Sequence, residues 1–350
     1  MFEDLLPAWG GEEVIVRFDE PSATWMFVCV DSTVLGPSAG GTRMKTYAEP
    51  RDALRDGLRL SSAMTSKNAM AGLPLGGGKA VLAVPEIPTG VSRRELLLRY
   101  GDLVESLHGT YRTACDMNTS PADMDVVGER SAFVFAKTEA AGGSGTSAPA
   151  TAVGVFNGLR GAVAHAFGTD DLGGRAIAVQ GVGAVGEPLA RELADHGTRL
   201  VLTDVDDVRA KELAQELDAE TVGPDEVYDA ECDVFAPCAT GGVLSAATIP
   251  RLRCRVVAGA ANNQLAEPQD ADGLAERGIL YAPDYVVNAG GMIHLASLEM
   301  LGEDVAARDE RLRGIGDTLG EVFALAERRG ISTAAAADAI VEERLAAGRA

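Results

Sequence analysis

The sequence predicts an α/β protein of two domains, with a mixed sheet in the first domain and a doubly wound parallel sheet in the second. The chain has 350 residues, which is too long for one ordinary hydrophobic core. Its second half alternates short apolar runs with helical segments, a rhythm typical of a parallel sheet with helices on both faces. A glycine-rich turn follows the first of these runs, as such a sheet requires where it binds a ligand.

Composition excludes several classes of function. Hydrophobic residues make up 46% of the chain and charged residues 24%, which is typical of a soluble globular protein. The formal net charge of −21 weighs against nucleic-acid or anionic-membrane partners, because phosphates are bound by clustered Lys and Arg. The five cysteines lack the spacing of a zinc site and the density of a disulfide scaffold. With no signal-like start and no membrane-spanning run, we expect a cytoplasmic protein with reduced thiols.

The first domain is expected over residues 1–145. Apolar runs within Val14–Leu35 (VIVRF, WMFVCV and STVL) predict antiparallel strands. Helices are expected at about Pro50–Ala69 and Ser92–Leu107. Between them, LPLGGGKAVLAV predicts a glycine-rich turn that leads into an apolar strand, and TYRTACDMNT predicts a later strand that ends in a polar loop.

A Gly/Ser-rich linker at 141–148 leads to the second domain, which is expected over residues 146–327. Its apolar runs AIAVQ, RLVLTDV, DVFAP and RVVAGA predict parallel strands separated by helical segments. Three further helices are expected at about Thr151–Ala166, Asp309–Arg328 and Thr333–Ala347. The last helical segments, at about 328–350, can pack back on the first domain.

The run AIAVQ leads directly into Gly181-Val-Gly183-Ala-Val-Gly186 and then into a helical segment. This is the context of the Rossmann dinucleotide fingerprint. The first glycine permits the tight turn, the second lets the backbone approach the pyrophosphate, and the third lets the helix pack close to the strand. The phosphate then lies at the helix N-terminus.

Asp204 ends the next apolar strand, where an acid can accept hydrogen bonds from the ribose hydroxyls. Its alternative role is that of a turn or helix N-cap acid. An acid at this place repels a 2′-phosphate and therefore favours NAD over NADP. Asp206 and Asp207 add to this preference, whereas Arg209 and Lys211 oppose it.

The first domain holds a second group of residues, formed by Lys67, Lys79 and Asp116. Most lysines are surface residues, and that alternative applies to each lysine taken alone. Lys79 stands directly after GGG and before the apolar AVLAV, where the glycines bring backbone close to it. A partly desolvated lysine beside another cation has a lowered pKa and can act as a base near neutral pH.

These residues lie in blocks that resemble the glutamate/leucine/phenylalanine/valine dehydrogenase family over nearly the whole chain. The blocks, in matching order and spacing, are GPSAGGTRM (36–44), KNAMAGLPLGGGKAV (67–81), TACDMNTSPADMD (113–125), TSAPATAVGV (146–155), GVGAVG (181–186), APCATGGVL (236–244), VAGAANNQLA (257–266) and APDYVVNAGGMI (282–293). The resemblance implies an N-terminal substrate-binding domain, a C-terminal NAD-binding Rossmann domain and oxidative deamination of an L-amino acid. Hydride passes from Cα to NAD, the imine is hydrated, and ammonia and a 2-oxo acid leave, without a metal.

By the family pattern, Lys67 holds the substrate α-carboxylate, Lys79 is the base that activates water, and Asp116 carries protons to and from the amino group. The resemblance places these further residues at the substrate: Asn262, Gly40, Gly41, Ala39, Met64, Ala114, Met292 and Leu295. It places these residues at the cofactor: Gly181, Gly183, Ala184, Val185, Gly186, Asp204, Ser147, Thr151, Cys238, Ala239, Ala261 and Asn288. Alternatively, the Asn and Thr residues stabilise turns or cap helices and do not contact a ligand.

Two positions speak against glutamate as the substrate. Glutamate-specific relatives carry a lysine where this chain has Ala39 and a serine where it has Leu295. Without them the pocket is apolar, and burial of an unpaired carboxylate is costly. Ala114 resembles the branched-chain enzymes, whereas Met292-Ile-His-Leu295 resembles the phenylalanine enzymes. Both substrate classes remain open, with a small preference for branched-chain amino acids.

Two other functions compete with this interpretation. A 2-hydroxy-acid dehydrogenase normally relies on a His–carboxylate pair and an Arg, and no such pair is evident in the sequence. A catalytically silent NAD-binding regulator would not need Lys67, Lys79 and Asp116. We expect small-molecule partners and a homo-oligomer, at least a dimer through the first domain.

Overall fold

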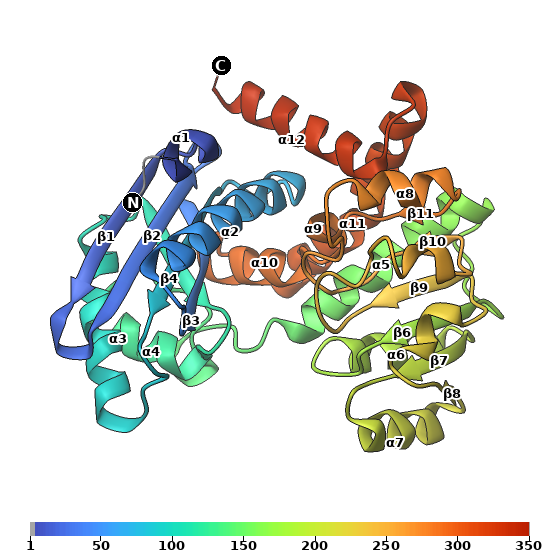
Figure 1. The fold of residues 1–350 in the computed structure, drawn as a ribbon, viewed down its shortest axis with the longest axis horizontal. Helices are drawn as coiled ribbons and strands as arrows, with labels where there is room; N and C mark the ends of the chain where they lie inside the picture. The colour runs from blue at the N-terminus through green and yellow to red at the C-terminus, as the bar shows by residue number, and fades with distance from the viewer. Residues whose placement is uncertain (1–3, 350) are drawn as a thin grey trace. The chain divides into compact units, whose positions relative to one another are not determined.

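The computed structural model describes residues 4–349 and divides into two compact units. Unit 1 comprises Met1–Thr146, Leu295–Glu303 and Val341–Ala350, and unit 2 comprises Ser147–His294 and Asp304–Ile340. Figure 1 labels most of the helices and strands of both units. Relative to the division expected from the sequence, Leu295–Glu303 moves to the first unit, and the last helix is shared between the two.

Unit 1 is built on a mixed five-stranded sheet in the order β1-β2-β4-β3-β5. Its strands are β1 Glu13–Asp19, β2 Thr24–Ser32, β3 Ser38–Lys45, β4 Gly76–Ala83 and β5 Tyr111–Cys115. β2 pairs antiparallel with β1 and β4, whereas β3 runs parallel to β4 and β5. The mixed sheet expected for the first domain is thereby confirmed.

Helices cover both faces of this sheet (Figure 1). They are α1 Leu5–Trp9, α2 Pro50–Met70, α3 Gly90–Glu105 and α4 Pro121–Gly128, with short 3-10 turns at Glu20–Ser22 and Glu139–Ala141. Leu54 of α2 packs with Phe27 and Val81 on one face. On the other face, Tyr100 of α3 and Met124 of α4 lie in one core cluster with the strands. Alternate residues of β2 and β4 therefore enter two different cores.

Two details of unit 1 differ from the sequence prediction. The run STVL does not form a strand of its own, since β2 ends at Ser32 and a turn follows. The glycine triplet is not a turn but the first part of β4, and a Cβ on Gly77 would lie 2.1 Å from the backbone nitrogen of Thr65 on α2. The glycines therefore let α2 pack directly on β4.

Unit 2 is a six-stranded parallel sheet in the order β11-β10-β9-β6-β7-β8. Its strands are β6 Ala176–Gln180, β7 Arg199–Thr203, β8 Glu220–Thr221, β9 Val234–Pro237, β10 Val256–Val257 and β11 Leu280–Tyr281. When these strands are numbered from one within the unit, their order is the 3-2-1-4-5-6 order of the Rossmann fold. The predicted doubly wound domain is confirmed.

The remaining helices follow the alternation predicted from the sequence. They are α5 Ala148–Phe167, α6 Gly186–Asp195, α7 Asp207–Leu217, α8 Asp270–Glu276, α9 Asp284–Val287, α10 Gly290–Leu295, α11 Val305–Arg329 and α12 Thr333–Gly348. Short 3-10 turns lie at Glu226–Asp229 and Ile249–Arg251, and a π-helical turn lies at Ala296–Met300. The helices expected near α5, α11 and α12 are confirmed, whereas the helical stretch from α9 through the π turn was not predicted. Within residues 4–349, no helix has the length and apolarity needed to cross a membrane.

Candidate active site

Lys79 and Asp116 meet in unit 1, with the lysine Nζ 3.1 Å from the carboxylate Oδ2. Lys79 lies on β4 and Asp116 directly follows β5, so the strand β3 separates them in the sheet. At the level where they meet, β3 carries Gly41. A Cβ on Gly41 would lie 2.8 Å from the Cβ of Asp116 and 2.6 Å from the carbonyl oxygen of Cys115. Between the lysine and the aspartate, β3 therefore presents bare backbone at Gly41, which we call the glycine floor of β3.

The charges of this pair depend on burial and on each other. Lys79 is only 5% exposed, and this burial lowers its pKa below the ordinary value. Asp116 opposes that shift by its negative charge, and Arg43 adds to it. Burial by itself raises the pKa of Asp116, but Lys79 and Arg43 outweigh burial and lower it to about 2. Asp116 is therefore a carboxylate at any pH near neutrality, and Lys79 loses its proton more readily than a surface lysine.

Sequence reasoning missed the residues that hold this pair. Arg43 donates from Nε to Asp116 Oδ2 at 2.9 Å and from Nη1 to Asp56 Oδ2 at 2.9 Å. Asp56 on α2 also accepts hydrogen bonds from Tyr47 at 2.7 Å and Arg59 at 3.0 Å. Arg43 belongs to the block GPSAGGTRM, but nothing in the sequence pattern distinguishes a buried arginine from an exposed one.

Four of the other substrate candidates of unit 1 lie on the Gly41 face of the sheet or on α2. Ala39 is fully buried in β3 and Ala114 is 3% exposed in β5, and both share the face of Gly41. Met64 and Lys67 are half-buried on α2, and their spacing of three residues places them on one helix face. A further substrate candidate, Gly40, packs its backbone against the carbonyl oxygen of Gly78. The last candidate of this unit, Leu295, is buried at the end of α10.

The fingerprint glycines of unit 2 have three different surroundings. Gly181 has a φ of +93°, and a Cβ on it would lie 2.7 Å from the Cβ of Ala239. A Cβ on Gly186 would lie 1.8 Å from the carbonyl oxygen of Gly181, so only glycine lets α6 approach β6. A Cβ on Gly183 would meet nothing within 4 Å. The helix α6 begins after Val185, whose side chain makes no capping hydrogen bond.

Asp204 already holds two backbone groups of unit 2. Its Oδ2 accepts from the amide of Val182 at 2.8 Å, and its Oδ1 accepts from the amide of Asp206 at 2.9 Å. Asp204 therefore does serve as a turn acid, the alternative considered from the sequence, and these two hydrogen bonds fix its carboxylate beside the fingerprint. Each carboxylate oxygen retains a further lone pair for a ribose hydroxyl. Arg209 and Lys211 form ion pairs with neighbouring acids at 3.5 and 2.6 Å.

The remaining cofactor candidates gather at the carboxyl ends of the strands and at the start of α5. The amide of Cys238 bonds the carbonyl of Gln180, and that of Ala261 bonds Pro237, so both follow the edge where Rossmann folds bind ligands. Asn288 is 5% exposed and donates to Asn262 Oδ1 at 3.0 Å. Of the other cofactor candidates, Ala184 is exposed, and Ser147 and Thr151 are half-buried. Met292, which was predicted to contact the substrate, is also half-buried.

Two observations show that the residues of unit 2 fit a dinucleotide. The space over Gly183 admits a group that approaches the backbone, and the amides at the start of α6 suit a phosphate. The buried Oδ1 of Asn288 has no hydrogen-bond partner in the part of the chain that the structure describes, and a carboxamide could supply the missing donor. For a metal the described residues offer no group of three or more His, Cys, Asp or Glu ligands.

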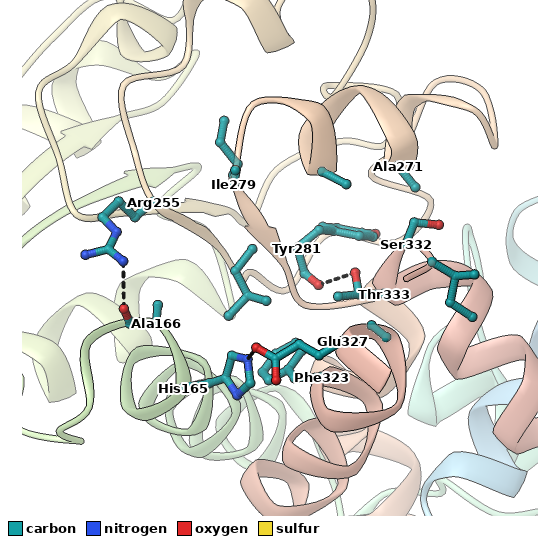
Figure 2. Close-up of a pocket in the computed structure, with 15 residues that line it drawn as sticks. His165, Ala166, Arg255, Ala271, Ile279, Tyr281, Phe323, Glu327, Ser332 and Thr333 are labelled. Carbon is teal, nitrogen blue, oxygen red and sulfur yellow. Dashed lines mark hydrogen bonds and ion pairs between the residues drawn. The ribbon is translucent and has the colours of Figure 1, made fainter. Parts of the chain in front are cut away.

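A separate pocket of about 360 Å³ lies elsewhere on unit 2 (Figure 2). In it, His165 contacts Glu327 at 3.0 Å, and Arg255 donates to the carbonyl of Ala166 at 2.8 Å. Arg255 precedes β10 and Ile279 precedes β11, so the pocket opens at the amino ends of the parallel strands. The fingerprint follows the carboxyl end of β6, and the pocket is therefore not the dinucleotide site.

Comparisons with known proteins agree with this architecture. Residues 23–132 match the profile of the Glu/Leu/Phe/Val dehydrogenase dimerisation domain, and residues 202–314 match that of Glutamate/Leucine/Phenylalanine/Valine dehydrogenase. The chain is 43% identical to the leucine dehydrogenase of Thermoactinomyces intermedius over 98% of this chain and 93% of that protein. It is 44% identical to the valine dehydrogenase of Streptomyces albus over 97% of this chain and 94% of that protein.

A solved structure gives the same answer. The L-tryptophan dehydrogenase of Nostoc punctiforme superposes with a TM-score of 0.88 at 37% identity, covering 100% of this chain and 99% of that one. The fold and these matches define the class of the protein as a pyridine-nucleotide-dependent amino-acid dehydrogenase. The chain belongs to the glutamate/leucine/phenylalanine/valine dehydrogenase family, which confirms the resemblance found in its sequence.

Proposed function

We propose that this enzyme uses NAD to deaminate an apolar L-amino acid, of the leucine, valine or phenylalanine type, to the 2-oxo acid and ammonia. The observation that carries the proposal is the buried Lys79 in contact with Asp116 across the glycine floor of β3. A desolvated lysine with a lowered pKa can act as a general base, which this reaction requires and simple nucleotide binding does not.

Each residue of this group has a distinct role in the proposed reaction. Lys67 binds the substrate α-carboxylate by a charge-assisted hydrogen bond. When bound, the cofactor supplies the hydride acceptor for the substrate Cα. Asp116, a carboxylate at the start, first takes a proton from the substrate ammonium group, and hydride then leaves Cα. Unprotonated Lys79 takes a proton from the water that adds to the imine carbon, and Asp116 returns its proton to the departing amino group. Asn262 helps to fix the substrate.

Asp204 supports NAD rather than NADP as the cofactor. Its carboxylate is fixed beside the fingerprint by the amides of Val182 and Asp206. A 2′-phosphate at this place would meet a negative charge, while a ribose diol would find acceptors. Arg209 and Lys211 are engaged by neighbouring acids, which reduces their attraction for a 2′-phosphate.

The side-chain pocket proposed for the substrate is apolar. Ala39 and Leu295 are buried and offer no charge or hydroxyl to a γ-carboxylate, so glutamate would be bound poorly. Relatives at 43% and 44% identity are named leucine and valine dehydrogenases. The tryptophan dehydrogenase is 40% identical when the sequences are aligned, and 37% identical over the structural superposition given above. This supports the small preference for branched-chain amino acids suggested by Ala114.

We further propose that the enzyme is a homo-oligomer, at least a dimer through unit 1. The matched profile at residues 23–132 is described as a dimerisation domain, which supports this choice. We also propose that the enzyme works in a reducing compartment such as the cytoplasm, where its five cysteines would stay reduced.

A substrate panel tests the proposed function. NADH formation is measured at alkaline pH with leucine, valine, phenylalanine, glutamate and the 2-hydroxy acid that corresponds to leucine, and ammonia release is measured in parallel. We expect NADH and ammonia in equal amounts from at least one apolar amino acid, and little from glutamate. Turnover of the hydroxy acid alone would identify a different dehydrogenase. NADH binding without any turnover would favour a catalytically silent regulator.

A further inference from the structure

Asp116 presents its two oxygens differently. Lys79 Nζ at 3.1 Å and Arg43 Nε at 2.9 Å both contact Oδ2. The other oxygen, Oδ1, accepts no hydrogen bond from any residue within 4–349, and the side chain is 27% exposed. Two cations therefore fix one oxygen of the carboxylate, and the second oxygen remains available to exchange a proton with a substrate amino group.

Arg43 is itself held in place from the opposite side. Its Nη1 donates to Asp56, which lies on α2 and also accepts from Tyr47 and Arg59. The side chains of Arg43 and Asp56 are each only 15% exposed. Paired, buried and planar, the guanidinium has little freedom to turn, so the position of Asp116 follows from that of Arg43.

Resting on the proposed deamination, we propose that Arg43 is a positioning residue of the reaction. Its guanidinium holds Asp116 Oδ2 against Lys79, directs Oδ1 to the proton exchange, and places a permanent positive charge beside the base. It does not touch the substrate and acts through Asp116 and Lys79.

Within residues 4–349, the largest charges that act on Lys79 are those of three groups on three elements. Asp116 after β5 and Asp56 on α2 are negative and favour the protonated amine, whereas Arg43 on β3 disfavours it. Cys29, the register partner of Lys79 on β2, is neutral, because burial raises the pKa of its thiol to about 12. Without Arg43, Lys79 would face two carboxylates and would hold its proton to higher pH.

The test is the pH dependence of kcat for leucine deamination in Arg43→Gln, compared with wild type. The reaction needs unprotonated Lys79, so its rate rises with pH through the pKa of this lysine. In Arg43→Gln, which lacks the cation, the rising limb of the pH–rate profile should move to higher pH by about one unit, and kcat near neutral pH should fall roughly tenfold. Arg43→Lys keeps the charge without the two-sided guanidinium contact, and its limb should stay near that of wild type although its kcat falls.

Asp56→Asn is the matched variant of opposite sign. It removes a negative charge from the same network, so the limb should move to lower pH. General damage to the fold would lower all rates equally and would not move the limb in opposite directions in the two variants. Thermal unfolding of each variant, compared with wild type, confirms that unit 1 is folded, since NADH binding reports on unit 2.

The proposal is overturned if Arg43→Gln keeps the wild-type limb, or if Arg43→Lys shifts as far as Arg43→Gln. Absence of deamination in wild type would instead remove the proposed function, and this inference with it. An active wild type with an unmoved limb in Arg43→Gln removes the role of Arg43 alone.

Discussion

An added methyl group should affect two glycines of the fingerprint differently, lowering stability at Gly186 and cofactor binding at Gly183. Gly186 lies where a Cβ would come within 1.8 Å of the carbonyl oxygen of Gly181, and neither backbone atom can move without separating α6 from β6. Gly183 lies where a Cβ would meet no protein atom within 4 Å. Gly186→Ala should therefore damage the fold, and Gly183→Ala should damage only the approach of the cofactor.

The magnitudes follow from these surroundings. Overpacking of a tight contact costs about 1–3 kcal/mol, or roughly 2–12 °C in Tm for a domain of this size. Gly183→Ala should leave the free energy of unfolding within about 0.5 kcal/mol of wild type. If its methyl group displaces one hydrogen bond to a phosphate, it loses about 1.5–3 kcal/mol of binding, or roughly 10- to 150-fold in Kd for NADH.

Thermal unfolding without cofactor and a fluorescence titration with NADH measure the two effects separately. We expect a lower Tm for Gly186→Ala and a near-normal Tm with weak NADH binding for Gly183→Ala. If Gly183→Ala binds NADH as wild type does, the cofactor does not approach the backbone there. If it is as unstable as Gly186→Ala, the packing argument itself is wrong.

Two further predictions concern specificity. Asp204→Ser should narrow the preference for NAD over NADP in kcat/KM, because it removes both the ribose contacts and the repulsion of a 2′-phosphate; equal kcat/KM for the two cofactors in wild type would show that Asp204 does not distinguish them. Combining Ala39→Lys with Leu295→Ser should raise the ratio of glutamate to leucine activity, since a buried carboxylate then finds a charge and a hydroxyl. The ratio is measured on protein that still binds NADH, and an unchanged ratio would mean that these residues do not contact the substrate side chain.

Much of unit 2 could be predicted because its elements follow local patterns. Each of its longer parallel strands is a short apolar run, and the fingerprint marks the turn after β6. The stretch from α9 to the π-helical turn was missed because NAGG interrupts it with two glycines, which normally argue against a helix. Gly290 is needed there because a Cβ would lie 2.5 Å from the carbonyl oxygen of Ala150 on α5.

Unit 1 was harder to predict, because there too glycines required by tertiary packing hide a regular element. β3 carries Gly40 and Gly41, lacks apolar alternation and has Thr42 as its single β-branched residue, so little in the local sequence marks it as a strand. Its pairing with β4 and β5 is set by tertiary contacts. The sequence identified Lys79 and Asp116 through a family resemblance, but it did not show that Lys79 and Arg43 contact the same carboxylate oxygen of Asp116. That contact depends on strand order, which residue spacing does not encode.

The central claim, that Lys79 is the base of the reaction, is tested most directly by the kinetics of Lys79→Ala on the preferred amino acid. Lys79 belongs to unit 1 and the fingerprint to unit 2, so NADH binding should be almost unchanged while kcat falls far below a tenth of the wild-type value. Lys67→Ala, which removes another lysine of unit 1 that is assigned to carboxylate binding, is the matched control and should chiefly raise KM. If Lys79→Ala retains more than about a tenth of kcat, less than the usual loss when a general base is removed, Lys79 is not the base.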